Sequence, residues 1–241
     1  MKLWQRIGLL TLAVLAVAGI RIFFIWRERN APMALPPQHQ ERQLTSDDIV
    51  QPRKLLIDDL KSAKELIGKP VWVAAGYQLD YYPFVNQHVD YAHRTGLLPT
   101  TTQLQIEDLV TQNAPAKAVT RIPHGNEQVY AVFTLPGGAK KYATAIGYLD
   151  GTDSKFYCDD IFYYDDPHQM YKHWPPDVWQ AIDQHQPKVG MNELQVSMAL
   201  GQVQTSDSSN YGNRTVHYDV AGKQWTVNFD HNHATQVNQS Q

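Results

Sequence analysis

Apolar residues alternate with a period of two between Val71 and Phe162, and this pattern limits the possible folds more than any other feature of the chain. The alternation is clear in Leu104–Ile106 and in Val129–Leu135, and it is typical of strands with one face on a core. Pro136–Gly138 and Asp150–Gly151 are turn sequences that separate such strands. The pattern predicts about five or six short strands in a small all-β domain, either a bent sheet or an SH3-like barrel.

An apolar run occupies residues 7–26 and is interrupted by Arg21. Its roughly 20 residues would extend about 30 Å as a helix, enough to cross a bilayer. Lys2 and Arg6 precede it, which favours an N-terminus inside the cell. We therefore expect residues 1–29 to contain a transmembrane helix through which the protein binds the membrane. The predicted location is the cytoplasmic membrane, single-pass, with the bulk of the chain periplasmic or extracellular.

A cleaved secretory signal is the alternative for the same segment, because Ala16-Val17-Ala18 has the small-x-small pattern of a cleavage site. Residues 30–45, with prolines and glutamines and little to bury, read as a linker. The remainder divides into residues 46–165, a helix followed by the small β domain, and residues 166–241. The helix is predicted from the apolar stripe Leu56, Leu60, Ala63 and Ile67, and it should end at Gly68.

The best-defined helix start in the chain is at Asn192. Asn192 is a preferred N-cap, and Gln195 three residues later completes a capping box. Val196, Ala199 and Leu200 have the spacing of a buried helix face, and Gly201 supplies a left-handed stop. The segment therefore predicts a short, sharply bounded packing helix with no catalytic group on it.

The sequence around this helix alternates between helical and strand patterns. Pro175–Ile182 should form a preceding helix. Val216–Val220 and Trp225–Phe229 should form a hairpin, with a third strand near Val237, after a polar, disorder-leaning loop at 205–213. The fold class predicted for the whole chain is α+β: a transmembrane helix, a small all-β domain, and then an α-α-β-β-β domain.

Two segments of this last domain resemble the BamE/SmpA-like family, also called SmpA/OmlA. They are Val189–Gly201, with its glycine-methionine-polar helix start, and Trp225–Asp230. The resemblance covers about residues 175–241. It implies an α-α-β-β-β fold like that of an accessory lipoprotein of the outer-membrane β-barrel assembly machinery. It also implies a non-catalytic interaction module whose partners are bacterial envelope proteins. Val203 replaces a proline common in the family, and no lipobox cysteine is present, so lipid anchoring does not carry over.

Carboxylates and histidines are densest at Asp159-Asp160 and at Asp165, Asp166, His168 and His173. A hydrolase or metal enzyme using Asp165, Asp166, His168 and His173 is an alternative function. The two histidines are five positions apart, which does not place them on one helix face, and the chain contains no HExxH or CxxC motif. We therefore expect no catalytic residues, no metal and no cofactor. The single cysteine, Cys158, is expected to be buried and inert.

Aromatic residues gather near the strands, and proline at position 83 favours exposure of the cluster around it. Such residues either fill a β core or form a binding surface. The candidate interaction surface consists of Tyr81, Tyr82, Phe84, Tyr163, Tyr164 and Trp174. A cell-wall or peptide-binding module that uses Tyr81–Phe84 is a further alternative.

The formal net charge of −3 provides no basic field, so nucleic acid is not expected as a partner. A small-molecule substrate is not expected either. The sequence favours a membrane-tethered envelope protein that acts in protein–protein interaction or assembly.

Overall fold

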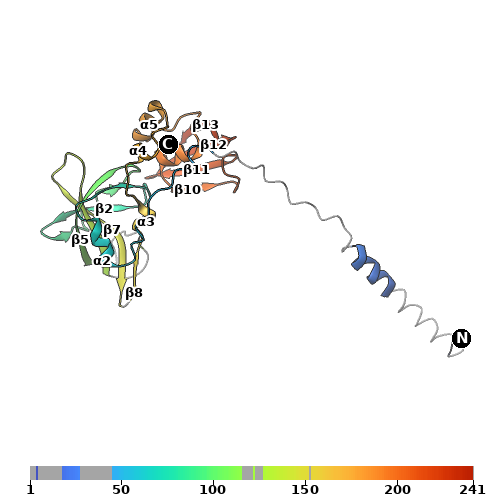
Figure 1. The fold of residues 1–241 in the computed structure, drawn as a ribbon, viewed down its shortest axis with the longest axis horizontal. Coiled ribbons are helices and arrows are strands. Elements are labelled where there is room, and N and C mark those ends of the chain that lie inside the picture. Colours follow the sequence, from blue (N-terminus) through green and yellow to red (C-terminus); the bar gives the residue numbers. More distant parts are fainter. Residues whose placement is uncertain are drawn as a thin grey trace. The chain divides into compact units, whose positions relative to one another are not determined.

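The computed structural model describes residues 4, 18–27, 45–115, 122, 127–151 and 153–240. The chain forms two compact units, residues 1–44 and residues 45–241 (Figure 1). The predicted linker at 30–45 lies outside the described residues except for Thr45. The predicted boundary between residues 165 and 166 falls inside the second unit.

The first unit contains a helix at residues 18–27, whose large apolar side chains, among them Phe23, Phe24 and Trp26, are exposed. The described helical residues 18–27 rise about 15 Å, roughly half the hydrocarbon thickness of a bilayer. Among the described residues, no helix is both long enough and apolar enough to span a membrane. The predicted transmembrane helix, and with it the single-pass location in the cytoplasmic membrane, is therefore wrong. Residues 7–17 of the predicted span lie outside the described residues.

The fold class is also corrected, since the described chain is mainly β-sheet rather than α+β with a membrane helix. Its larger sheet follows the order β3-β2-β7-β6-β5-β1-β9, with β4 on β2 and β8 on β7, and every pair is antiparallel. The path is open within the described residues, which distinguishes it from a closed barrel. Its strands are β1 (Pro70–Val73), β2 (Asp80–Val85), β3 (His88–Val89), β4 (Gly96–Leu97), β5 (Gln103–Asn113), β6 (Glu127–Thr134), β7 (Lys141–Asp150), β8 (Asp153–Phe156) and β9 (Phe162–Tyr163).

The hairpins of this sheet form where the sequence predicts them. Strand β6 pairs with β7 across the turn at Gly137, and β7 pairs with β8 across Gly151, both with positive φ. Strand β6 is buried on both faces, because Val129, Ala131 and Phe133 enter one core and Tyr130 and Val132 another. The two-residue strands β3, β4 and β9 have too few residues to show a periodic pattern in the sequence.

The helix predicted from Leu56 to Ile67 is much shorter. It consists of α2 (Leu60–Ala63) followed by the 3-10 turn η1 (Lys64–Leu66). Asp59 caps α2 by accepting a hydrogen bond from the Ser62 amide, so the helix begins after it. Leu56 is exposed with a φ of 53°, which is incompatible with a helix at that position.

The last third of the chain packs helices against a second sheet (Figure 1). Among its helices, α5 contacts α6 and α6 contacts β11. The sheet has the order β10-β11-β12-β13. The predicted loop at 205–213 is partly ordered into β10, where Thr205 pairs with His217. The elements of this part are α4 (Pro167–Met170), α5 (Pro176–Asp183), α6 (Glu193–Leu200), β10 (Gln204–Ser206), β11 (Thr215–Val220), β12 (Lys223–Asp230) and β13 (His233–Ser240). Helix α3 (Cys158–Ile161) instead contacts β7 and β9 of the larger sheet.

The capping box of α6 is confirmed in both directions. The Asn192 side chain accepts from the Gln195 amide at 2.8 Å, and the Asn192 amide donates to the Gln195 side chain at 2.9 Å. Gly201 ends the helix with a φ of 90° and a ψ of −174°. The positive φ is as predicted, but this conformation lies outside the left-handed helical region and is open essentially to glycine alone.

The second unit contains separate hydrophobic cores that meet near Gly76 and Gly201. A Cβ on Gly201 would lie 2.7 Å from the Gly76 carbonyl oxygen, so the two backbones approach closely. Thr100 reinforces the contact by donating to the Met198 carbonyl at 2.5 Å, and both residues are buried. Tyr77, next to Gly76 in the chain, belongs to the C-terminal core. The α6 terminus is therefore in direct contact with the segment that leads into β2.

Candidate functional site

The residues of the predicted aromatic surface do not all lie on one face of the protein. Tyr81 and Tyr82 point to opposite faces of β2 because successive strand residues alternate. Tyr81 is half-buried and packs edge to face on Tyr142, with ring centroids 5.3 Å apart. Tyr82 is only 2% exposed and packs on Tyr91 at 5.6 Å. Phe84 is half-buried against the same core as Tyr82. Tyr82 therefore cannot serve as an exposed contact.

Of the three remaining residues of the predicted surface, two are buried and therefore cannot serve as exposed contacts. Tyr164 is 7% exposed and donates its hydroxyl to Asp159 at 2.7 Å. Trp174 is 5% exposed and stacks on Tyr171 with centroids 4.4 Å apart. Tyr163 is half-buried beside the C-terminal core. The six residues thus do not form one exposed interaction surface, because most of their area fills the cores.

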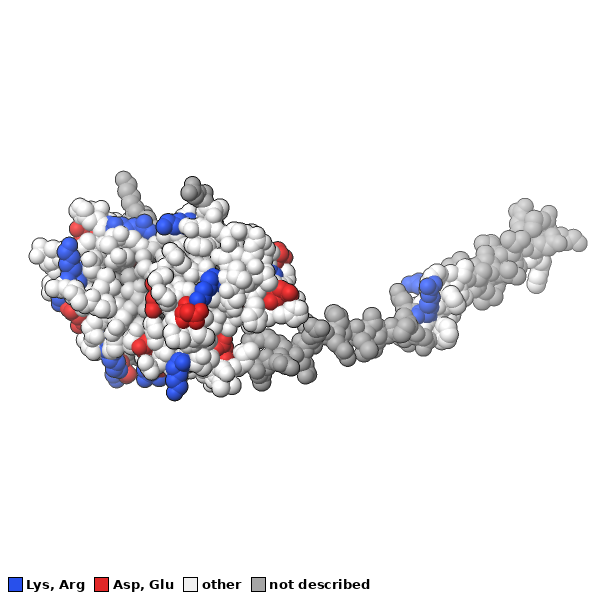
Figure 2. All heavy atoms as spheres, turned by 90° about the horizontal axis from the view of Figure 1, so that it is seen from above, with Lys and Arg blue, Asp and Glu red and all other residues white. Residues whose placement is uncertain are grey.

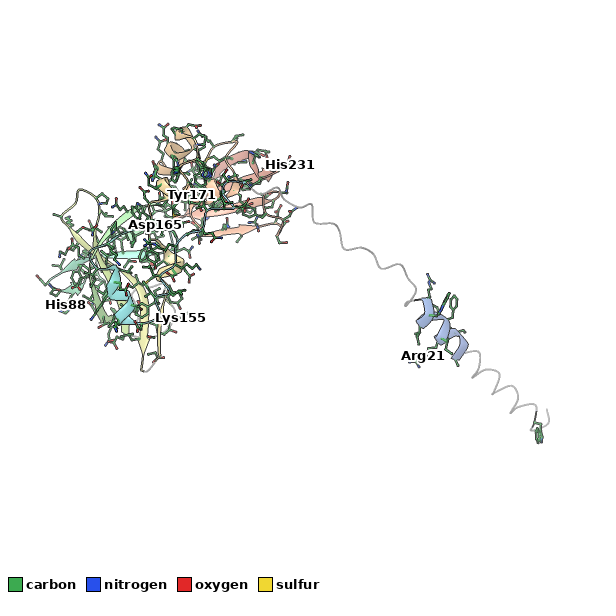
Figure 3. All side chains as sticks on the ribbon, viewed as in Figure 1. Arg21, His88, Lys155, Asp165, Tyr171 and His231 are labelled. Carbon is green, nitrogen blue, oxygen red and sulfur yellow. The ribbon has the colours of Figure 1, made fainter. Side chains whose placement is uncertain are left out.

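The acidic and histidine cluster does not converge on a reaction centre. Asp165 pairs with Arg53 at 3.0 Å (Figure 3 labels Asp165). Asp166 caps α4 by accepting from the His168 amide at 2.9 Å. The His168 ring lies 3.2 Å from Asp183 on α5. In the part of the chain that the structure describes, no three His, Cys, Asp or Glu side chains are grouped to hold a metal ion.

His173, the fourth member of that cluster, belongs to a different site. It lies 2.5 Å from Asp47, whose side chain is 11% exposed. The same carboxylate accepts from the Trp174 indole at 2.6 Å and from the Asn192 amide group at 2.7 Å. We name this arrangement the Asp47 clasp. Its three donors come from the C-terminal part of the chain, whereas Asp47 comes from the segment before α2.

Residues 45–57, which we call the strap, run over the second unit without forming a helix or strand. The Asp47 clasp holds their beginning. Arg53 donates to the Tyr164 carbonyl at 2.9 Å and to Asp165 at 3.0 Å. The strap is therefore attached by side chains that are more than a hundred residues distant in the sequence.

Asp159 holds the end of the strap. Its two carboxylate oxygens accept from the backbone amides of Leu55 and Leu56, at 2.9 and 2.8 Å. Partial burial opposes ionisation of this carboxyl, but the hydrogen bonds from Leu55, Tyr164 and Leu56 prevail and hold its pKa below the usual value. The charged form of Asp159 is thus the form that binds the strap.

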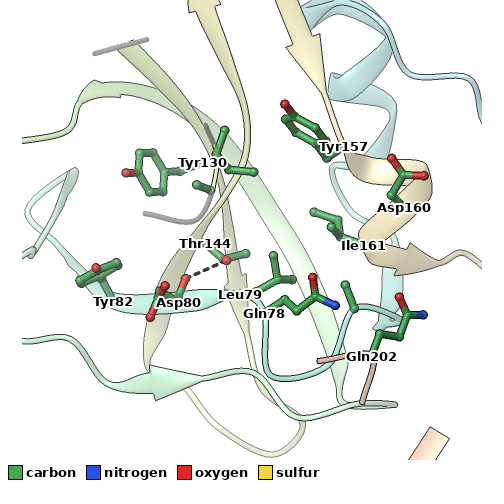
Figure 4. A pocket seen from close by; sticks show the side chains of 13 residues that line it. Gln78, Leu79, Asp80, Tyr82, Tyr130, Thr144, Tyr157, Asp160, Ile161 and Gln202 are labelled. Atoms are coloured by element: carbon green, nitrogen blue, oxygen red, sulfur yellow. Dashed lines mark hydrogen bonds between the residues drawn. The ribbon is translucent and has the colours of Figure 1, made fainter. Parts of the chain in front are cut away.

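A cavity of about 220 Å³ lies between the start of β2, strands β6 and β7, and α3 (Figure 4). Three tyrosines contribute to its wall, and Figure 4 shows Tyr157 and Tyr130 on different sides of it. The lining consists of Ala75, Gln78, Leu79, Asp80, Tyr82, Ile122, Tyr130, Thr144, Ala145, Tyr157, Asp160, Ile161 and Gln202. The cavity is therefore part apolar and part hydrogen-bonding.

Asp80 is the buried charged residue of this cavity, with 3% of its side chain exposed. Arg94, outside the cavity lining, pairs with it at 2.5 Å. Thr144 donates its hydroxyl to the Asp80 carbonyl at 2.9 Å, which links β2 to β7 at this point. Burial raises the pKa of the Tyr130 phenol, so that ring remains neutral.

Sequence reasoning missed Asp47, Asp80 and Asp159 as binding groups. The only local signals are that Asp80 lies at the start of an apolar strand and that Asp159 follows Cys158 in a short helix. Neither signal identifies a partner, and Asp159 and Leu55 are 104 residues apart. Asp47 has no local signal, and its partner Asn192 is 145 residues away. Charges of both signs are interspersed on the face in Figure 2.

The comparisons with protein-family models, curated proteins and solved structures found no match to this chain.

Proposed function

We propose that residues 45–241 form a non-catalytic protein-interaction module that recognises an extended peptide segment. The observation that carries this proposal is the strap. The folded unit holds this irregular segment through a clasped carboxylate, an arginine pair and two backbone amides. These are the contacts by which receptors bind extended peptides.

The spacing of these contacts defines the partner. A matching peptide has an acidic residue, a basic residue six positions later, and two free amides just beyond. In the strap these features are Asp47, Arg53 and the Leu55–Leu56 amides. A partner segment with the same features can occupy the same contacts when the strap is displaced.

The polar groups considered for catalysis support binding instead. His173 and Asp165 contact the strap directly, and Asp166 caps a helix. The resemblance of residues 175–241 to the BamE/SmpA-like family points in the same direction, because that family implies protein interaction.

The test uses a fluorescently labelled peptide with the sequence of residues 45–57 and the full-length protein. In the variant D47N/R53A the chain's own strap is weakened, because each change removes one attachment. We expect this variant to bind the peptide at least tenfold more tightly than the unmodified protein, whose strap competes for the site. Fluorescence anisotropy measures the affinity.

Two controls make the result specific. A peptide carrying the same two substitutions should bind weakly, since it lacks the groups that the clasp and Asp165 recognise. Circular dichroism establishes that the variant remains folded. Equal binding of both peptides, or no binding of either to the folded variant, would rule out peptide recognition at these contacts.

A further inference from the structure

We propose that the cavity next to Asp80 binds a cationic group, either a primary ammonium or a guanidinium. This site is separate from the strap contacts, because none of the side chains that hold the strap lines the cavity. The inference therefore stands or falls independently of the proposed function.

The size of the cavity restricts the ligand. Its volume of about 220 Å³ is below the roughly 300–1,000 Å³ of pockets for drug-sized ligands. A dinucleotide or an oligosaccharide does not fit inside it. The end of one long side chain, or a small amine of similar length, does.

The charge of the lining selects the sign of the ligand. Asp80 and Asp160 contribute carboxylates, and the described lining residues include no lysine, arginine or histidine. Arg94 offsets part of the Asp80 charge from outside the cavity. Asp160, which is exposed, leaves the mouth acidic. An anionic ligand would meet these carboxylates without a cation in the lining, whereas a cation gains mainly from Asp160 and less from Asp80, which Arg94 partly neutralises.

The aromatic wall favours the same class of ligand. The ammonium of Lys155 lies 5.2 Å from the centre of the Tyr157 ring, which is the geometry of a cation–π contact, and it also places one positive charge beside this wall. Tyr157 is half-buried and contributes to the cavity wall, as Figure 4 shows. Because water is partly excluded there, a cation facing tyrosine rings is held more strongly than at an open surface.

Carboxamides complete the recognition. Gln78 and Gln202 both line the cavity, and Gln202 lies on the same side as Asp160 in Figure 4. Their carbonyl oxygens can accept from the several N–H groups of an ammonium or a guanidinium. The required ligand therefore has a cationic head with multiple donors and a short aliphatic stem. A lysine or arginine side chain of a partner protein fits this description, and so does a free small amine.

In the test, three probes are titrated into the full-length protein, and binding is monitored through changes in the protein's NMR chemical shifts. Agmatine represents a free amine, a blocked pentapeptide Gly-Gly-Arg-Gly-Gly represents a side chain, and the same peptide with glutamine at its centre removes the charge. We expect saturable shifts with at least one cationic probe and none with the glutamine peptide. Tighter binding of agmatine indicates a free amine as ligand, and tighter binding of the arginine peptide indicates a partner side chain.

Variants connect this binding to the cavity. D160N should lower the affinity for the cationic probe about fivefold, which corresponds to the energy of a partly exposed ion pair. The variant should fold because Asp160 is exposed. D58N changes an exposed carboxylate outside the lining and should leave the affinity unchanged. Absence of saturable binding overturns the proposal. So does equal binding of the glutamine peptide, or an affinity that D160N does not reduce.

Discussion

Replacing Gly201 by alanine tests whether α6 and the segment before β2 are in contact as described. The added Cβ would lie 2.7 Å from the Gly76 carbonyl oxygen and 3.0 Å from a ring carbon of Tyr77. Real Cβ atoms do not approach a backbone oxygen so closely, so one of the two backbones has to move. The substitution therefore acts on the junction between two cores as well as on the end of one helix.

The expected cost has two parts. Alanine at a φ of 90° and a ψ of −174° is strained by about 1–3 kcal/mol. Overpacking against Gly76 and Tyr77 adds about 1–3 kcal/mol. We expect G201A to lower the free energy of unfolding by about 3 kcal/mol, a large fraction of the stability of a typical domain.

Gly222 provides the matched control, since its φ is 91° and a Cβ there meets nothing within 4 Å. G222A should cost only the conformational strain, about 1 kcal/mol. Urea unfolding of both variants, followed by tryptophan fluorescence, measures the difference. If G201A and G222A are destabilised equally, the close approach of Gly201 to Gly76 does not exist in solution, and our account of the junction is incorrect.

The remaining predictions concern a buried ion pair and the cysteine. Glu193 is fully buried and accepts from the Gly212 amide and from the Arg214 guanidinium. E193Q should lower the free energy of unfolding by about 3 kcal/mol, and E193Q/R214M should recover part of that loss in urea titrations. Burial and the adjacent Asp159 raise the pKa of the Cys158 thiol to about 12. The native thiol should therefore resist a thiol reagent at pH 8 that labels the unfolded chain. Because the folded pKa exceeds the ordinary value of 9.0, this group's contribution to stability should be complete below pH 9 and decline towards pH 12. Rapid labelling of the native thiol, or an E193Q variant as stable as the unmodified protein, would contradict these assignments.

Because Asp159 holds the strap, the stability of the folded protein should depend on pH in the acidic range. Its folded pKa is lower than the ordinary value of 3.8, so the stability that it contributes is complete above that pH. That contribution is lost as the pH falls through the folded pKa, because a protonated carboxyl accepts the Leu55 and Leu56 amides less strongly. The end of the strap is thus held by a charged group at neutral pH.

Local patterns in the sequence determined much of the secondary structure. The alternation in Val129–Leu135 predicts β6, because successive strand residues face opposite ways whatever they pack against. The capping box at Asn192 and the turn at Pro136–Gly138 likewise form where predicted. Each depends on residues within a few positions of one another, so their hydrogen bonds can be inferred without knowledge of the fold.

Only the tertiary structure decided which side chains are available for function. Tyr82, Tyr164 and Trp174 have the residue types of a binding surface, but packing places all three in the interior. Composition does not distinguish an exposed aromatic residue from a buried one. Among the described residues, no helix is both long enough and apolar enough to be the membrane span that apolarity alone predicted.

The contacts of the strap show most clearly what the sequence alone does not reveal. Asp47 and Asn192, 145 residues apart, are joined by the clasp, and Leu55 is joined to Asp159 across 104 residues. Neither pairing leaves a periodic or local trace in the sequence. A polar side chain near an apolar stretch can form its hydrogen bonds with water, with its own turn or with a distant partner. Which of these it does depends on which segments the packing of the cores brings together. The sequence by itself determined the longer strands, the α6 cap and the hairpin turns, whereas the packing of the cores determined the clasp and the cavity.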